Sequence, residues 1–297
     1  MLPSPLADWI RMKTRHSDPA QLSFWSSERA RPVQETTLAT PSMTAICLQS
    51  GSSGNCTYIE TKDAKLLVDA GITAIQVERR LRELGRDPHS VDALLVTHDH
   101  ADHARHMGVY QRKFGIPIHV TSGCLEAASR SMELGAMDDV HTFRPGQCVE
   151  LGDTRVRSIP TPHDGTQGVA FVVASGGKRL GVLTDLGHVF DELRSVIGSL
   201  DAVILESNYD PDMLSRGSYP AFVKQRIRGP RGHLSNEDAA ELLRDHASNR
   251  LRWACLAHLS EENNDPELAL RVHRRIVGRR FALRLAGRHA ATEAMMI

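Results

Sequence analysis

Short apolar runs alternate with segments of helical periodicity from Thr44 to the end of the chain. Runs rich in Val, Ile and Leu predict buried strands at 44–48, 57–60, 65–68, 93–96, 154–159, 169–173, 179–183, 202–205 and 253–257. Apolar residues that recur every three or four positions predict helices at 72–84, 104–114, 124–134, after Ser235 and at 266–277. Because strands and helices are interleaved in both halves, the pattern favours a layered α/β sandwich.

Residues 1–42 differ from the rest of the chain, since they are rich in Pro, Ser, Thr and Arg and show little periodicity. They predict a poorly ordered N-terminal extension, followed by one domain over residues 43–297. No apolar run approaches the roughly 18 residues that span a membrane, and the first ten residues lack the apolar core of a signal peptide. Five widely spaced cysteines without a C-x-x-C pair indicate buried thiols in a reduced compartment. We therefore expect a cytoplasmic protein without membrane contact.

The charge balance excludes a globally basic protein and leaves a local basic groove possible. The chain of 297 residues carries 36 basic and 36 acidic side chains, so its formal net charge is zero. A globally basic nucleic-acid-binding protein is therefore excluded, whereas a local basic groove is not. Two arginine-rich segments, 224–231 and 271–288, are candidates for such a groove. Charge runs are more often solvated surface, and that reading stays open for both segments.

Fifteen histidines outnumber Phe, Tyr and Trp together, and one cluster of them carries most of the chemical information. Residues 97–103 read Thr-His-Asp-His-Ala-Asp-His, directly after the predicted strand at 93–96. Potential metal ligands within this segment are His98, His100, Asp102 and His103. So many titratable side chains at one strand end cannot all be satisfied core residues. Imidazole and carboxylate together suit divalent zinc, manganese or iron and leave coordination positions open for water.

This segment resembles the H-x-H-x-D-H signature of the metallo-β-lactamase fold, a four-layer αβ/βα sandwich. The family pattern also requires four residues in order, each at the end of a strand or in the loop after it, and the sequence offers Asp69, His163, Asp185 and His258. The resemblance covers essentially residues 44–290. The signature together with four further matches in the right order makes a chance similarity improbable.

The resemblance implies a centre of two divalent metal ions. His98, His100 and His163 would hold one ion, and Asp102, His103 and His258 would hold the other. Asp185 would bridge the two ions. Asp69 would orient the ligands and a metal-bridging hydroxide that acts as the nucleophile.

Two further motifs narrow the branch of this fold. An Asp at position 185 is typical of glyoxalases, phosphodiesterases and nucleases, whereas many lactamases have Cys there. Residues 204–208 and 232–236 resemble paired elements of the tRNA 3′-processing branch, in which Glu206 would support His233 as general acid. A strand-end carboxylate and a helix-entry histidine without catalytic roles are the alternatives.

The motifs at 50–55, 206–208, 232–236 and 258–264 together resemble the bacterial WalJ/YycJ family. That resemblance implies a single-domain nuclease with 5′-exonuclease activity on DNA. Tyr209 departs from the family pattern, where His is common. The segment between Asp185 and His258 is too short for a cap domain, so an open, shallow site is expected.

Substrate contacts are predicted around these motifs. The Gly51–Gly54 loop offers backbone N–H groups and hydroxyls for a phosphate, although a tight turn explains it equally well. The candidate contacts are Ser53, Asn55, Asn208 and Ser235.

The leading hypothesis is a metal-dependent phosphodiesterase acting on nucleic acid, DNA rather than RNA. Hydrolysis of a small phosphodiester, thioester or lactone is the alternative, and a regulatory or scaffolding protein with an ancestral site is the third. The sequence leaves open the native metal, the polarity of cleavage and the oligomeric state.

Overall fold

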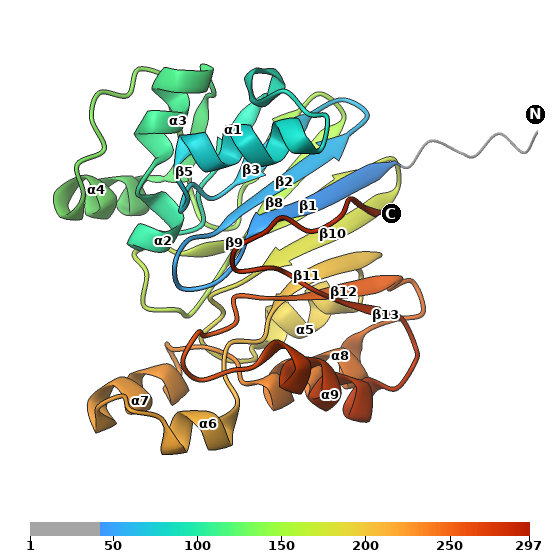
Figure 1. The fold of residues 1–297 in the computed structure, drawn as a ribbon. Coiled ribbons are helices and arrows are strands. Elements are labelled where there is room, and N and C mark those ends of the chain that lie inside the picture. The colour runs from blue at the N-terminus through green and yellow to red at the C-terminus, as the bar shows by residue number, and fades with distance from the viewer. Residues whose placement is uncertain (1–41) are drawn as a thin grey trace, which may run out of the picture. The chain divides into compact units, whose positions relative to one another are not determined.

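The computed structural model describes residues 42–297, so the predicted extension lies outside the described residues except for Ser42. Two seven-stranded sheets pack face to face (Figure 1). The first sheet runs in the order β14 (Met295–Met296), β1 (Met43–Gln49), β2 (Cys56–Thr61), β3 (Lys65–Val68), β4 (Ala93–Leu95), β5 (Ile118–Thr121) and β6 (Val140–Phe143). The second runs in the order β13 (Ala282–Leu285), β12 (Trp253–Ala257), β11 (Ala202–Glu206), β10 (Lys178–Leu183), β9 (Val169–Ser175), β8 (Thr154–Pro160) and β7 (Cys148–Leu151).

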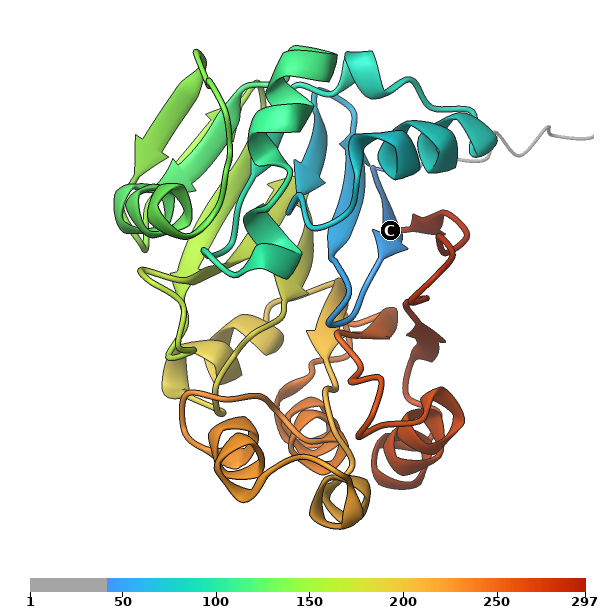
Figure 2. The ribbon, with the colours of Figure 1, turned by 60° about the vertical axis from the view of Figure 1, so that its left-hand side comes forward.

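Helices cover the outer face of each sheet (Figures 1 and 2). The first sheet packs against α1 (Ala74–Glu83), α3 (Met107–Phe114) and α4 (Ser122–Ser131). The second packs against α5 (Asp191–Ile197), α8 (Asn236–His246) and α9 (Pro266–Val277). The predicted four-layer αβ/βα sandwich is therefore confirmed. No described helix has the length and apolar character needed to cross a membrane.

The central strands are apolar on both faces because each face meets a different layer. In β1, Ala45 and Cys47 join the core between the sheets, whereas Ile46 and Leu48 join the core under the helices. Successive side chains of a strand point to opposite faces. A strand that is covered on both sides therefore reads as a continuous apolar run, which is how the sequence revealed it.

Most predicted elements are confirmed to within about two residues, and three of them, β3, β12 and α9, match in both bounds. The helix predicted at 104–114 is wrong in one respect, since it is divided into α2 (Ala101–Ala104) and α3. The pattern also missed five strands, β5, β6, β7, β13 and β14, and the helix α5. It missed the short α6 (Pro211–Arg216) and α7 (Ala221–Arg228) and the 3-10 turn Pro88–Ser90 as well. All five cysteines are free and four are buried as expected, but Cys148 is exposed.

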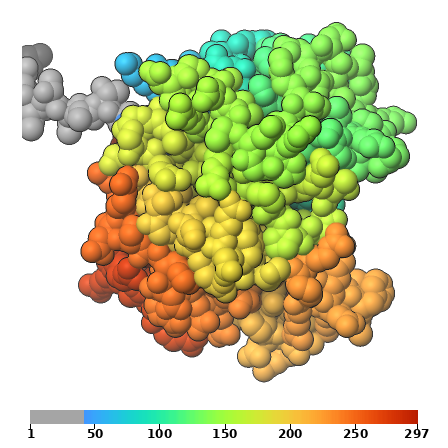
Figure 3. All heavy atoms as spheres, turned by 180° about the vertical axis from the view of Figure 1, so that it is seen from behind, coloured from blue at the N-terminus to red at the C-terminus, as the bar shows by residue number. Residues whose placement is uncertain are grey.

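The connection from β11 to α8 contains α6 and α7, which form a separate lobe at one corner of the described domain (Figure 3). No residue of α7 is buried. The helix therefore contributes little to the core, and its side chains can contact solvent or a bound ligand.

Candidate metal centre

The candidate ligands lie where parallel strands end. Asp69 directly follows β3, Asp185 lies two residues after β10, and His258 directly follows β12. Because β3 is parallel to β4, and β10, β11 and β12 are mutually parallel, the carboxyl ends of these strands meet at one edge of each sheet. Side chains that are far apart in the sequence are thereby brought to one place.

Three of these positions have an unusual backbone conformation. Asp69, Asp185 and His258 have φ angles of 67°, 56° and 54°. Gln167 is the only other non-glycine residue of the described chain with a positive φ. Such left-handed conformations cost roughly 1–3 kcal/mol for a residue with a side chain and concentrate at functional sites. Because this strain lowers stability, it indicates that the positions of these three side chains serve the function of the protein.

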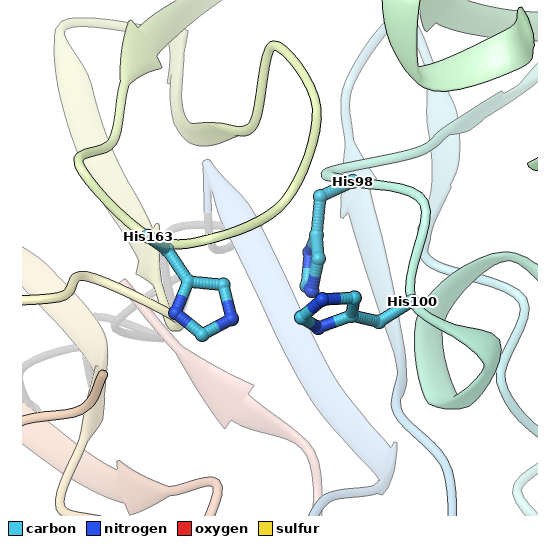
Figure 4. Close-up of side chains that lie close together, drawn as sticks. All are labelled: His98, His100 and His163. Carbon is cyan, nitrogen blue, oxygen red and sulfur yellow. The ribbon is translucent and has the colours of Figure 1, made fainter. Parts of the chain in front are cut away.

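The first ligand group consists of three histidines that face one another (Figure 4). Ligand atoms of His98, His100 and His163 all lie within 4.8 Å of one another. The Nδ1 atom of His163 lies 2.8 Å from the Gly232 carbonyl oxygen, which orients the ring. Burial and the neighbouring histidines hold the pKa of His98 well below its usual value, so the ring is neutral. A neutral imidazole is the form that binds a metal.

The second ligand group lies beside the first. Ligand atoms of Asp102, His103 and His258 lie within 4.8 Å of one another. Asp102 Oδ2 is 3.4 Å from His103 Nε2 and 3.5 Å from His258 Nε2. The structure thus brings together the six residues that the resemblance assigned to two ions.

Asp185 lies between the two groups. Its Oδ2 is 3.3 Å from His103 Nε2, and its Oδ1 is 3.6 Å from His163 Nε2. Burial would raise the pKa of Asp185, but His258, His103 and His163 together hold it below its usual value. The carboxylate is therefore ionised and lies within contact distance of histidines from both ligand groups.

The unsatisfied atoms of this cluster fit a bound cation. Buried polar atoms are almost always hydrogen-bonded. Among the described residues, the buried atoms without a hydrogen-bond partner include the Nε2 atoms of His98, His163 and His258 and the Oδ2 atom of Asp185. These atoms belong to the converging ligand groups, and nitrogen and carboxylate oxygen are donors that divalent zinc, manganese and iron accept.

Asp69 supports the ligands from behind. The residue is 3% exposed, and its Oδ2 lies 2.7 Å from His103 Nδ1. The backbone N–H and the hydroxyl of Thr97 both donate to Oδ1, at 2.8 Å. A carboxylate in this position fixes the ring orientation of a ligating histidine.

Glu206 and His233 form a close pair at the side of the cluster. His233 Nδ1 lies 2.6 Å from Glu206 Oε1. Glu206 is completely buried, and its other oxygen accepts the backbone N–H groups of Leu186 and Leu234. Burial would raise the pKa of Glu206, but His233 and His258 hold it well below its usual value. The carboxylate therefore stays ionised and can stabilise a protonated imidazole.

The same pair is also close enough to take part in metal binding. Asp185, Glu206, His233 and His258 form a further group whose ligand atoms lie within 4.8 Å of one another. Geometry alone therefore allows His233 to act as a proton donor or as a ligand, and the two roles require separate experiments.

Asp164 is a residue of the site that the sequence analysis missed. Its Oδ1 lies 3.4 Å from His100 Nε2 and 3.3 Å from His163 Nε2, and its Oδ2 lies 2.6 Å from Arg226 Nε. Burial would raise the pKa of Asp164, but the Arg226 guanidinium holds it below its usual value. Its position directly after His163 was the available signal.

A cleft of about 180 Å³ opens onto these ligands. Val223, Arg226 and Ile227 of α7 line one side of it, and Ser52 lines another. α7 therefore forms part of the cleft wall, a feature that the expectation of an open, shallow site did not include. Of the two arginine-rich segments, only the first contributes a cleft residue, Arg226.

The predicted substrate contacts divide into one exposed residue and three buried ones. Ser53 is exposed, and its hydroxyl oxygen accepts a hydrogen bond from Gln49. The Asn55 amide group lies 3.0 Å from His103 Nε2, and the Asn208 amide donates to the His258 carbonyl oxygen. Ser235 caps α8 and bonds Asp238. These hydrogen bonds give Asn55, Asn208 and Ser235 structural roles, and contact with the substrate stays a prediction.

Comparisons with known proteins identify the family. Residues 64–258 match the family described as beta-lactamase superfamily domain. Exodeoxyribonuclease WalJ of Streptococcus pneumoniae serotype 2 is 39% identical over 224 residues, which cover 75% of this chain and 83% of WalJ. Exodeoxyribonuclease YycJ of Bacillus anthracis is 35% identical over 222 residues, which cover 75% of this chain and 84% of YycJ. The crystal structure of the metallo-beta-lactamase fold protein YhfI from Bacillus subtilis has a TM-score of 0.66 at 17% identity and covers 85% of this chain and 99% of that one. The chain therefore belongs to the WalJ/YycJ family of metal-dependent hydrolases with the metallo-β-lactamase fold.

Proposed function

We propose that this protein is an exodeoxyribonuclease that hydrolyses DNA phosphodiester bonds with two divalent metal ions. The observation that carries the proposal is the buried His/Asp cluster with unpaired ligand atoms, flanked by the Glu206–His233 pair at 2.6 Å. The WalJ and YycJ relatives, both named exodeoxyribonucleases, support the substrate class. Because the motifs resemble those of the WalJ/YycJ family, we expect the protein to degrade DNA from the 5′ end.

The proposed ligand assignment follows the geometry of the two groups. His98, His100 and His163 would hold one ion, and the other would lie between the remaining ligands, Asp102, His103 and His258. Asp185 contacts both groups and would be shared. Two ions bound in this way would lower the pKa of a water molecule and stabilise negative charge on the phosphoryl oxygens.

The protein's own side chains supply the remaining steps. Arg226 lines the cleft and presents a guanidinium to the phosphate that enters it. His233 would donate the proton that the leaving oxygen needs when the phosphodiester bond breaks. The ionised Glu206 accepts a hydrogen bond from His233 Nδ1 and stabilises the doubly protonated ring, in which Nε2 carries the transferable proton.

Asp164 has a different part in this scheme. Its carboxylate links Arg226 to the first ligand group, since it lies close to both Arg226 and the two histidines His100 and His163. We expect this link to keep the guanidinium near the metal centre while the cleft is empty.

One experiment tests the proposal against its alternatives. Purified protein, with metal content measured, is incubated with 5′-labelled single- and double-stranded DNA, matching RNA, and a panel of small phosphodiesters, thioesters and lactones, in Mn²⁺ or Zn²⁺. We expect release of nucleotides from the labelled end of DNA. Full metal occupancy without nucleotide release would refute the proposal, and turnover of a small ester alone would replace it with the alternative substrate class.

A further inference from the structure

A second cavity, of about 490 Å³, adjoins the catalytic cleft. Neighbouring residues of the same loop line the two spaces, since Ser52 lines the cleft and Ser53 lines the second cavity. Arg105 and His106 of the second cavity follow the proposed ligand His103 by two and three residues. A group bound in this cavity would therefore lie beside the metal centre but outside it.

The lining of this cavity carries positive charge that no carboxylate within it offsets. Arg79, Arg80 and Arg105 line it, and none of its lining residues is acidic. Arg80 is only 4% exposed, and the oxygens that its guanidinium contacts are all neutral, those of Leu48, Gln49 and His289. An arginine keeps its charge in proteins. The Arg80 guanidinium therefore adds positive charge to the cavity wall that no carboxylate in contact with it neutralises.

The other two arginines are free to move toward a ligand. Within residues 42–297, the Arg105 side chain makes no hydrogen bond and no ion pair. Arg79 pairs only with Glu83 at 3.9 Å, and both side chains are more than 60% exposed. Such a surface ion pair contributes little to stability, so Arg79 can leave Glu83 for a stronger partner.

Polar groups suited to phosphate oxygens accompany this charge. His106 also lines the cavity. The exposed Ser53 hydroxyl accepts a hydrogen bond from Gln49, which leaves its own proton to donate. The planar fork of an arginine can bind phosphate oxygens through two parallel hydrogen bonds.

We propose that this cavity binds a second phosphate group of the substrate strand, next to the phosphodiester that is cleaved. The inference rests on the proposed function, because it takes the ligand in the cleft to be a nucleic-acid strand. Such a strand, with one phosphate at the metal ligands, would pass over Ser52 and Ser53 and present a neighbouring phosphate to Arg79, Arg80 and Arg105. The site would thus select polymers over isolated phosphodiesters.

The test compares Arg79→Ala/Arg105→Ala with a matched control, Arg82→Ala. Arg82 lies on the same helix, pairs with Glu78, and does not line the cavity. Metal-loaded full-length protein is titrated with a fluorescent single-stranded oligonucleotide whose phosphorothioate linkages resist hydrolysis. We expect the double variant to bind roughly tenfold more weakly, and the slope of log Kd against log salt to fall by about 0.7 for each lost contact. The control variant should have the same Kd and the same salt slope as the wild type.

Three further comparisons make the outcome decisive. The double variant should lose far more turnover on DNA than on bis(p-nitrophenyl) phosphate, which carries no second phosphate. Equal losses on both substrates, or a wild-type Kd and salt slope, would overturn the inference while the proposed function stands. A wild-type protein that cleaves no DNA would instead overturn the proposed function. Comparing 5′-phosphate with 5′-hydroxyl oligonucleotides tells whether the bound phosphate is terminal or internal. If it is terminal, the loss of affinity in the double variant requires the 5′-phosphate, and if it is internal, both oligonucleotides show the same loss.

Discussion

Replacing His233 separates its two geometrically allowed roles. In His233→Ala, the Glu206 carboxylate loses its 2.6 Å partner but keeps the two backbone N–H groups that bond its other oxygen. The local fold should therefore survive. If His233 is the proton donor, turnover of DNA should fall by about 10²–10⁴-fold, which is the range for loss of a general acid. Metal content should stay at the wild-type level, because the other ligand groups are intact.

The size of the effect should depend on the leaving group. Bis(p-nitrophenyl) phosphate releases a stable phenolate that needs no proton, so the variant should lose much less turnover on it than on DNA. Glu206→Gln keeps the shape of the pair but removes the charge that supports the protonated ring. Charge-assisted hydrogen bonds contribute about 1.5–3 kcal/mol, which corresponds to a loss of roughly 10- to 150-fold.

The assay measures steady-state turnover on both substrates together with metal content by elemental analysis. His141→Ala is the matched control, because His141 is exposed and lies in β6, outside every ligand group. Equal losses on both substrates together with depleted metal would refute proton donation and assign His233 to the ligands. Unchanged DNA turnover would remove it from the mechanism altogether.

Three further predictions concern stability and metal. Gly71→Ala should destabilise the fold by about 3 kcal/mol or more and lower metal content, because its new Cβ would lie 1.8 Å from the Asp102 carbonyl oxygen. Gly85→Ala, which meets nothing within 4 Å, should cost about 1 kcal/mol in urea unfolding, and equal costs would refute the steric argument. Burial lowers the pKa of His273 to about 4. Between pH 6.5 and pH 4, His273 is therefore protonated in the unfolded chain but stays neutral in the native state. Stability should therefore fall as the pH drops from 6.5 toward 4, by about 2 kcal/mol at pH 5. His273→Leu should lessen that fall by the same amount, and an unchanged pH profile would contradict the assignment. Removing metal with a chelator should lower Tm, since a ligand that binds only the native state stabilises it, and an unmoved Tm in protein shown to be loaded would argue against a structural contribution of the metal.

The division of the helix predicted at 104–114 shows how tertiary contacts override a local pattern. The His106 N–H donates to the Ala70 carbonyl oxygen, and the Ala70 N–H donates to the His103 carbonyl oxygen. These long-range bonds replace part of the helical ladder and end α2. The periodicity contains no trace of them, because they involve a loop more than thirty residues away in the sequence.

The metal ligands within 97–103 could be predicted from the residues themselves, because so many His and Asp side chains at one strand end favour metal binding. Asp69, His163, Asp185 and His258 were predicted from the resemblance to the metallo-β-lactamase fold, whose ordered pattern they match. Apolar runs revealed the central strands of both sheets, since strands covered on two faces contain few polar residues. They did not reveal the outer strands β5, β6, β7, β13 and β14.

Other features were decided only by the tertiary structure. The Asp164–Arg226 contact, the burial of Asn55 among the ligands, and the collection of Arg79, Arg80 and Arg105 around one cavity each join distant segments. The local sequence gave signals for some of these residues, but it did not show which of them meet in the folded chain. The sequence by itself determined which side chains can hold metal, because ligand chemistry is a property of residue type. The tertiary structure decided which charges meet around the metal, because proximity is a property of the folded chain.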